Sequence, residues 1–109
     1  MFSFLRRKTA LDVINESTVE IYRKYAGNSL SDSDLLEVIQ TTMRAFKDAS
    51  VAKNENISGQ VLMNITAFMV MYRSNKSKDD WLSHLNNEVE LYLRSGLRNN
   101  YKNNYLVRI

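Results

Sequence analysis

The sequence predicts an all-α protein, specifically an antiparallel four-helix bundle that ends in a short C-terminal helix or tail. The chain has no proline and only three glycines in 109 residues. This argues against a loop-rich β fold, because such a fold needs frequent turn residues. In four segments, apolar residues recur at steps of three and four, the spacing of one helix face. The connections between them are about 4–7 residues long, so neighbouring helices should run in opposite directions. At this length, residues 1–109 are expected to form a single domain.

The first two predicted helices are amphipathic segments with recognisable ends. In the first, Thr9 can serve as the N-cap and Gly27 can end the helix. The second begins at Ser31 or Asp32 and fades in the polar run 53–56. The predicted apolar faces are Leu11, Ile14, Thr18, Ile21 or Tyr22, and Tyr25 in the first helix, and Leu35, Leu36, Ile39, Met43, Phe46 and Val51 in the second.

The third predicted helix begins near Ser58 and is apolar on almost all sides, which indicates a central helix buried by its neighbours. After a turn at residues 74–77, the fourth begins at Ser77 or Lys78 and stops at Gly96. Residues 97–109 are expected to form a short helix or a packed tail. The apolar residues are Val61, Leu62, Ile65, Phe68, Met69 and Tyr72 in the third helix, and Trp81, Leu82, Leu85, Val89, Tyr92 and Leu93 in the fourth.

The net charge of +3 is concentrated at the two ends of the chain. Residues 1–8 carry three basic residues and residues 91–109 carry four, and neither stretch contains an acid. Basic ends of this kind suit a phosphate backbone or an anionic membrane surface, and they also serve solubility alone. The most apolar stretch, Val61 to Tyr72, has 12 residues, whereas a membrane span needs about 20. We therefore expect a cytoplasmic protein.

The N-terminal extension, residues 1–8, combines apolar and basic side chains. One interpretation places it on the inner face of an anionic membrane, which would make the protein peripheral there. The other has its phenylalanines capping one end of the bundle core. The membrane-proximal candidates are Phe2, Phe4, Leu5, Arg6, Arg7 and Lys8.

The sequence offers little support for catalysis or for a metal site. It has no cysteine, one histidine and no Gly-rich phosphate loop. His84 could meet Glu88 one turn later, but this predicts a contact on a helix surface rather than a catalytic pair. Glu16 and Glu20 share a helix face, yet they lack the Glu-x-x-His motifs of metal-binding bundles. We expect a protein that is not an enzyme and that uses no metal or cofactor.

One short string and its surroundings resemble a known family. Residues 34–40, Asp-Leu-Leu-Glu-Val-Ile-Gln, resemble the opening of the second helix in enterocin-A-type (class IIa) bacteriocin immunity proteins. The first predicted helix carries Ile21-Tyr22, the apolar third helix ends in the Tyr-x-x-Asn-Lys segment 72–76, and the C-terminal tail carries tyrosines. The resemblance covers roughly residues 15–105, and residues 1–8 extend beyond the usual start of the family.

The resemblance implies a cytosolic four-helix bundle that protects a bacterium from a pore-forming peptide. Such proteins act at a membrane receptor, the mannose phosphotransferase permease, when the bacteriocin is bound to it. Recognition in the family lies largely in the C-terminal half, which makes the tail of this chain the candidate specificity surface. The partner-binding candidates, chosen by position and chemistry, are Arg94, Arg98, Tyr101, Lys102, Tyr105 and Arg108.

The alternative is a small phage- or plasmid-encoded helical regulator or adaptor that binds protein or nucleic acid through its basic tail. Residues 94–104 have suitable side chains for phosphates and bases. Nucleic acid is the less favoured partner, because no turn and helix of the right length precede these residues and the body of the chain is acidic. A steep loss of affinity with salt would identify contact with DNA.

Overall fold

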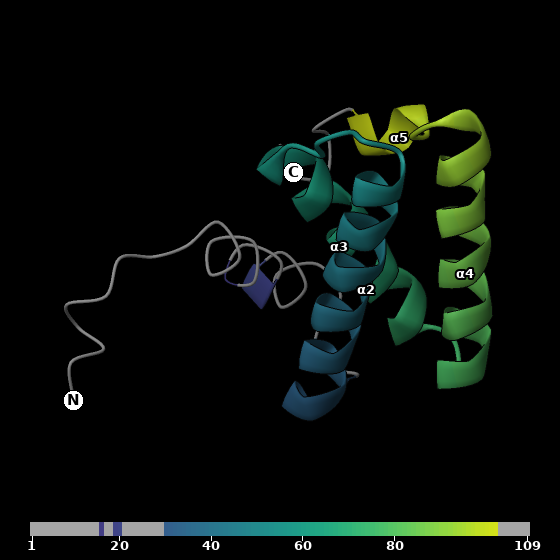
Figure 1. The fold of residues 1–109 in the computed structure, drawn as a ribbon. Coiled ribbons are helices and arrows are strands. Elements are labelled where there is room, and N and C mark those ends of the chain that lie inside the picture. Colours follow the sequence, from purple (N-terminus) through teal and green to yellow (C-terminus); the bar gives the residue numbers. More distant parts are fainter. Residues whose placement is uncertain (1–15, 17–18, 21–29, 103–109) are drawn as a thin grey trace, which may run out of the picture.

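The computed structural model describes residues 16, 19–20 and 30–102, with Asn99 and Asn100 described by their backbone alone. All regular structure in these residues is helical, which confirms the predicted all-α class for this part of the chain. The helices are α2 (Asp32–Ala52), α3 (Gly59–Ser74), α4 (Lys78–Ser95) and the single turn α5 (Asn99–Lys102) (Figure 1). Three are long where four were predicted. The predicted first helix lies outside the described residues, except for Glu16, Val19 and Glu20, which are helical.

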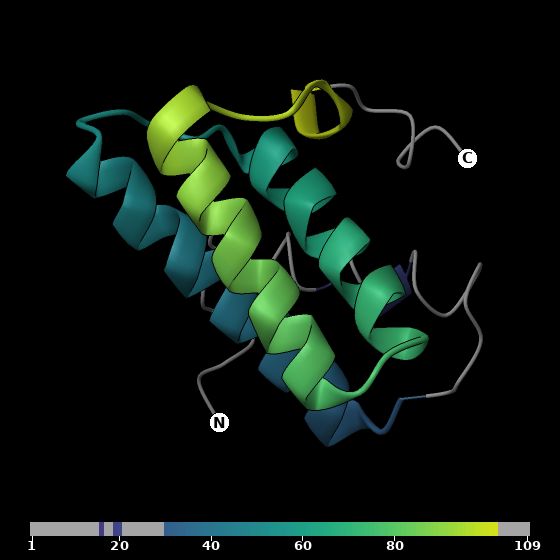
Figure 2. The same ribbon diagram turned by 90° about the vertical axis from the view of Figure 1, so that its right-hand side faces the viewer.

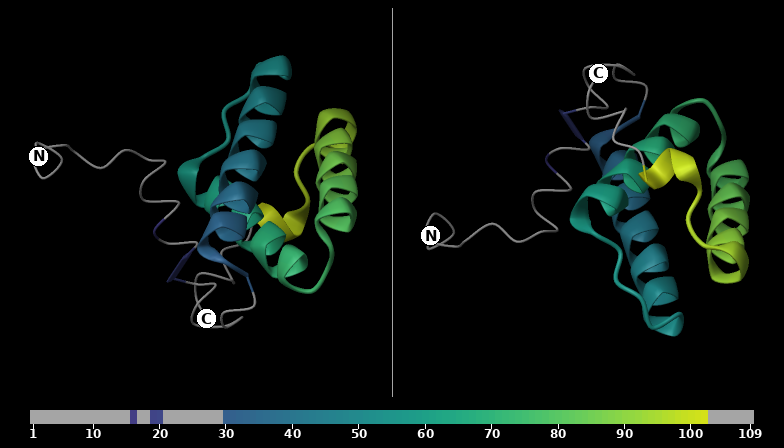
Figure 3. Two further views of the ribbon diagram at one scale, coloured as in Figure 1. Left: turned by 90° about the horizontal axis from the view of Figure 1, so that it is seen from below. Right: turned by 90° about the horizontal axis from the view of Figure 1, so that it is seen from above.

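The three long helices alternate in direction, as short connections require. α2 and α4 run the same way, and α3 returns against both of them (Figure 2). Two contacts fix this arrangement: Lys78 at the start of α4 reaches Glu37 near the start of α2, and Lys53 after α2 reaches the last turns of α4. α5 lies over α3, at the end where α2 and α4 finish (Figure 3, right).

A serine caps the N-terminus of each long helix. The hydroxyl oxygens of Ser31, Ser58 and Ser77 accept hydrogen bonds from the backbone N–H three residues on, at 3.1, 3.2 and 3.2 Å. These bonds satisfy donors that have no partner within the helix. The predicted starts of all three helices are therefore confirmed. α4 ends at Gly96, as predicted, where a φ of 86° favours glycine.

The core confirms that α3 is the central helix, since it is buried continuously from Leu62 to Ala67. Around it pack α2 and α4, whose largest fully buried side chains are Phe46 and Trp81. The main buried apolar residues are Leu35, Val38, Ile39, Met43, Phe46 and Ala49 in α2, Leu62, Met63, Ile65, Met69 and Val70 in α3, and Trp81, Leu85 and Tyr92 in α4.

Three residues predicted on apolar faces are instead exposed: Leu36 at 46%, Val51 at 72% and Leu93 at 41%. In α2 the centre of the buried arc is formed by Leu35, Ile39 and Phe46, about 80° around the helix from Leu36. Packing against two neighbours selects one of several apolar stripes, and spacing alone does not identify which one.

The segment after Gly96 forms the short helix that was one of its two predicted states, and residues 103–109 lie outside the described residues. No helix in the described ranges is long and apolar enough to cross a membrane.

Candidate functional site

Predicted partner-binding residues gather where α2 and α4 end. We call this region, residues 53–57 and 92–102, the basic end. Arg94, Arg98 and Lys102 are exposed here. Tyr101 lies at the same end but is only 5% exposed, so the expectation that it contributes an exposed surface is wrong. The remaining candidates lie outside the described residues: Tyr105 and Arg108 in the tail, and Phe2, Phe4, Leu5, Arg6, Arg7 and Lys8 in the N-terminal extension.

Tyr101 is buried because three helices hold it. Its ring makes edge contacts with Phe46 of α2 at 6.4 Å and with Phe68 of α3 at 5.6 Å, measured between ring centroids. Its carbonyl oxygen accepts a buried hydrogen bond of 3.0 Å from the Asn64 amide of α3. A helix of one turn has little stability of its own, so this anchoring accounts for the defined position of α5.

The carboxylate of Glu88 forms the centre of the polar contacts beneath α5. It is only 4% exposed. One oxygen accepts a hydrogen bond of 2.5 Å from the Tyr101 hydroxyl, and the other pairs with the Arg98 guanidinium at 3.0 Å. A buried charge is tolerated when it is paired and hydrogen-bonded in this way. We call Glu88, Arg98 and Tyr101 the α5 latch.

The α5 latch also changes the chemistry of its tyrosine. Burial raises the pKa of the Tyr101 hydroxyl above its usual value, and the hydrogen bond and negative charge of Glu88 raise it further. The nearby Arg98 opposes the shift. Tyr101 therefore remains a neutral hydrogen-bond donor to Glu88 throughout the physiological pH range.

The latch replaces the contact that the sequence suggested for Glu88. The expected partner, His84, instead stacks on Tyr72 of α3, with ring centroids 4.0 Å apart. The signal for burial was present in the spacing. Glu88 falls between Leu85 and Tyr92 on the stripe that begins at Trp81, so it occupies a core position of α4.

A second polar cluster joins the end of α2 to the end of α4. The Lys53 ammonium donates hydrogen bonds to the carbonyl oxygens of Tyr92, at 3.0 Å, and Leu93, at 3.4 Å. It thereby compensates the negative end of the α4 dipole. The Tyr92 hydroxyl donates to a Glu55 carboxylate oxygen at 3.0 Å. Burial, together with that carboxylate, raises the pKa of Tyr92 to about 12.

An open depression of about 400 Å³ lies beside the second cluster, whose Glu55 and Tyr92 contribute to its lining. One wall comes from the α2–α3 connection and the other from the segment that links α4 to α5. Ile57 and Leu97 are half-buried and pack against the core. The lining combines an acid, a base and apolar surface, contributed by Glu55, Asn56, Ile57, Tyr92, Gly96, Leu97 and Lys102.

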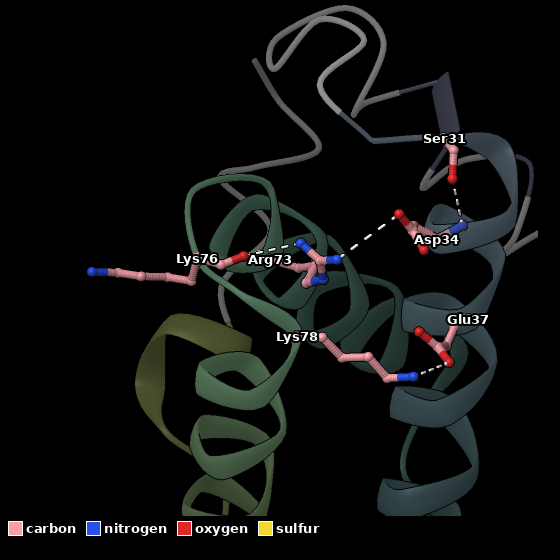
Figure 4. Close-up of polar contacts among 6 residues, drawn as sticks. All are labelled: Ser31, Asp34, Glu37, Arg73, Lys76 and Lys78. Atoms are coloured by element: carbon pink, nitrogen blue, oxygen red, sulfur yellow. Dashed lines mark hydrogen bonds and ion pairs between the residues drawn. The ribbon is translucent and has the colours of Figure 1, made fainter.

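The opposite end of the bundle has a different charge. We call residues 30–37 and 73–80 the acidic end, since they hold five acidic and three basic residues, whereas the basic end holds four basic residues and one acid. At the acidic end, Arg73 approaches Asp34 at 3.9 Å and donates to the Lys76 carbonyl at 2.9 Å, while Lys78 pairs with Glu37 at 2.9 Å (Figure 4).

The titratable side chains in and near the basic end already have partners. Tyr92 and Tyr101 are neutral hydrogen-bond donors, Glu88 is shielded beneath α5, and His84, one turn before Glu88 in α4, stacks on Tyr72. Within the described ranges, no group of three or more acidic or histidine side chains is placed to hold a metal ion.

No protein-family model, curated protein or solved structure matches this chain.

Proposed function

We propose that this protein is a non-catalytic binding protein and that the basic end is its partner surface. The observation that carries the proposal is that three exposed cations, Arg94, Arg98 and Lys102, lie at one end of the bundle, where Lys102 lines an open depression. Positive charge at one end of a small domain steers a negatively charged partner into the correct orientation. The α5 latch holds the segment that carries two of these cations, so little ordering is needed on binding.

More specifically, we propose a cytosolic bacteriocin immunity protein that contacts a membrane receptor complex of the mannose phosphotransferase permease type. The support is the resemblance of residues 34–40 and their surroundings to enterocin-A-type immunity proteins. The corresponding fold is a four-helix bundle in which the segment from Thr9 to Gly27 adds a helix to α2, α3 and α4. Val19 supports this proposal, because it is helical and packs against the core.

A protection assay tests the immunity proposal. The full chain is expressed in a strain sensitive to class IIa bacteriocins, and the inhibitory concentration of each peptide in a panel is measured. We expect protection against one or a few of the peptides. The paired substitution Arg94→Glu and Lys102→Glu should abolish protection. Lys76→Glu, which changes an exposed lysine at the acidic end, should leave it intact. Absence of protection against the whole panel would refute the proposal.

The second candidate is the helical regulator or adaptor that uses the same cations on nucleic acid. Three exposed basic side chains on one end of the molecule give it a specific basis. Measurement of duplex DNA binding against salt separates the two candidates. Three or four phosphate contacts predict a slope of about −3 to −4 in a plot of log affinity against log salt. An absence of binding at low salt would exclude the regulator function on DNA.

A further inference from the structure

We propose that α5 is exchanged between two copies of this chain, so that the protein forms a domain-swapped dimer. We call residues 97–102 the strap. In the dimer, the strap of each copy leaves its own bundle and occupies the same site on the other copy. The partner is a second copy of this chain, and the surface that receives its strap is the face of α2, α3 and α4 beneath α5. This inference goes beyond the proposed partner-binding function and does not depend on it.

The site beneath the strap is built by α2, α3 and α4. The Tyr101 ring contacts Phe46 of α2 at 6.4 Å and Phe68 of α3 at 5.6 Å, measured between ring centroids. The Tyr101 hydroxyl and the Arg98 guanidinium bind the two carboxylate oxygens of Glu88 in α4. Because none of these partners belongs to the strap, a strap from a second copy would meet the same contacts.

The strap is held by its side chains and not by a backbone ladder. Within residues 30–102, no backbone-to-backbone hydrogen bond joins the strap to another helix. The Tyr101 carbonyl accepts from the side-chain amide of Asn64 at 3.0 Å, and the Tyr101 N–H donates to Arg98 inside the strap. Exchange therefore breaks and re-forms a small set of contacts and leaves the three long helices intact.

Gly96 is the hinge between α4 and the strap. Its φ of 86° and ψ of −176° turn the chain back over the bundle, a combination essentially restricted to glycine. Figure 2 shows the chain leaving the end of α4 and crossing the end of the bundle to α5. With helical angles at Gly96, α4 would instead continue into the strap and carry it about 9 Å beyond the bundle.

The sequence also suits this extended form. In one continuous helix, Leu93, Leu97 and Tyr101 recur at steps of four and lie in one row along the helix surface. Leu93 is 41% exposed in the folded-back form, so the row begins with apolar surface that a single bundle leaves uncovered. The row ends in the tyrosine that fills the site on the second copy.

Glu88 makes an empty site costly and thereby favours exchange over simple opening. This residue is only 4% exposed, and both of its carboxylate oxygens are bound by the strap. If the strap left without replacement, the carboxylate would lose its donor and its cation together, beside the uncovered rings of Phe46 and Phe68. A strap from a second copy restores all of these contacts, so the closed monomer and the dimer differ mainly in hinge angles and in the entropy of association.

Two glycine variants of the full chain test the hinge. A methyl group added at Gly96 or at Gly59 would meet no neighbouring segment within 4 Å, and of the two only Gly96 has a positive φ. Gly96→Ala therefore strains the folded-back form alone. Because each dimer relieves two hinges, this variant should lower the dissociation constant of the dimer at least about thirtyfold. Gly59→Ala, the matched control, should change it less than about twofold.

Sedimentation velocity over a range of chain concentrations measures both dissociation constants, and circular dichroism shows that each variant folds. The two basic ends lie close together in the proposed dimer. Added salt should therefore strengthen the dimer, because it screens their repulsion.

Reversal of the latch charges shows whether the strap itself is exchanged. Arg98→Glu places an acid on the strap against Glu88, and Glu88→Lys places a base in the site against Arg98, so each variant repels its own strap. In a swapped mixture, each strap meets the opposite charge on the other copy. We expect dimers in an equimolar mixture and not in either variant alone, with thermal stability recovered on mixing. A chain with both substitutions is the control, since it can close on itself and should associate as the native chain does.

Either of two results would overturn the exchange. The first is a Gly96→Ala variant that associates no more strongly than Gly59→Ala. The second is a mixture of the two charge variants that stays monomeric although the doubly substituted chain folds. If the doubly substituted chain does not fold, the comparison of the two glycine variants decides the result alone.

Discussion

At the acidic end, Lys78 and Arg73 reach from α4 and α3 to carboxylates on α2; the Lys78–Glu37 pair lies at the surface, and Arg73 meets an Asp34 carboxylate that is half-exposed (Figure 4). Directly beneath the basic end, Glu88 of α4 is buried under α5 and bonded to Tyr101 and Arg98. Exposed pairs contribute little to stability, whereas a buried carboxylate becomes costly when it loses its partners. A charged group therefore contributes strongly to the free energy of unfolding only where it is buried, because water cannot hydrate a buried charge that loses its partner.

The direction of the helices explains part of the charge difference between the two ends. α2 and α4 run in parallel, so both begin at the acidic end, where Asp32, Asp34, Asp79 and Asp80 occupy their first turns. Acidic residues are favoured at helix N-termini. At the basic end, Lys53 compensates the end of α4 in the same way. Lys102 lies at the end of the single turn α5 and lines the depression.

The largest expected effect is on stability when the anchor of the basic end is removed. Tyr101→Ala deletes an aromatic ring packed on Phe46 and Phe68 and leaves Glu88 without its hydroxyl donor. We expect a loss of about 3–5 kcal/mol in the free energy of unfolding. Urea denaturation of the full chain measures it. A loss below about 1 kcal/mol would mean that α5 contributes no more than an exposed ion pair.

Substitutions that keep the ring packing of the α5 latch but remove its hydrogen bond should have a smaller effect on stability. Tyr101→Phe keeps the ring but removes the donor to Glu88, and it should cost about 1–3 kcal/mol. Glu88→Gln removes the charge and should cost a similar amount. Because the two groups share one hydrogen bond, the double variant should be less destabilised than the sum of the single variants predicts. If the losses of unfolding free energy in the two single variants simply added up in the double variant, a direct hydrogen bond between the two side chains would be contradicted.

Alkaline pH should reduce the contribution that the basic end makes to the free energy of unfolding. Folding raises the pKa of Tyr92 from 10.0 to about 12, so the folded protein holds the phenolic proton more tightly than the unfolded chain does. This contribution is complete below pH 10 and is lost as the pH rises from about 10 towards 12. The raised pKa of Tyr101 acts in the same direction.

Tyrosinate absorbance and urea denaturation across this pH range measure the effect. Glu55→Gln provides the control, because it removes the carboxylate that helps to raise the pKa of Tyr92. In that variant Tyr92 should ionise at lower pH than in the native protein. An unchanged titration would show that burial alone holds the proton.

The smallest expected effect is at the acidic end. Lys78→Ala removes an exposed ion pair with Glu37 and should cost less than about 1 kcal/mol, a difference that fades in about 1 M salt. Arg98→Ala removes the cationic partner of the buried Glu88. It should lower the free energy of unfolding by more than Lys78→Ala does, and salt should reduce this loss less. If urea denaturation gave the same loss of unfolding free energy for both variants, the exposed and the buried ion pair would not differ in their contribution to stability.

Much of the helical framework followed from local signals. Serine caps at 31, 58 and 77 and the stop at Gly96 depend on hydrogen bonds and backbone angles within one turn of the chain. The continuous apolar character of α3 likewise predicted its central place. In contrast, Leu36, Val51 and Leu93 were placed on the wrong faces, because a helix with several apolar margins has no local reason to bury one rather than another.

The candidate site likewise has some features that the sequence predicted and others that arise only from packing. The basic character of residues 94–102 was visible in the sequence, since charge is a property of single residues. The burial of Tyr101, its bond to Glu88 and the depression between the two connections depend on contacts between residues far apart in the chain. Such contacts form only when helices pack, because packing excludes water from one face and leaves each buried polar group to find its partner there.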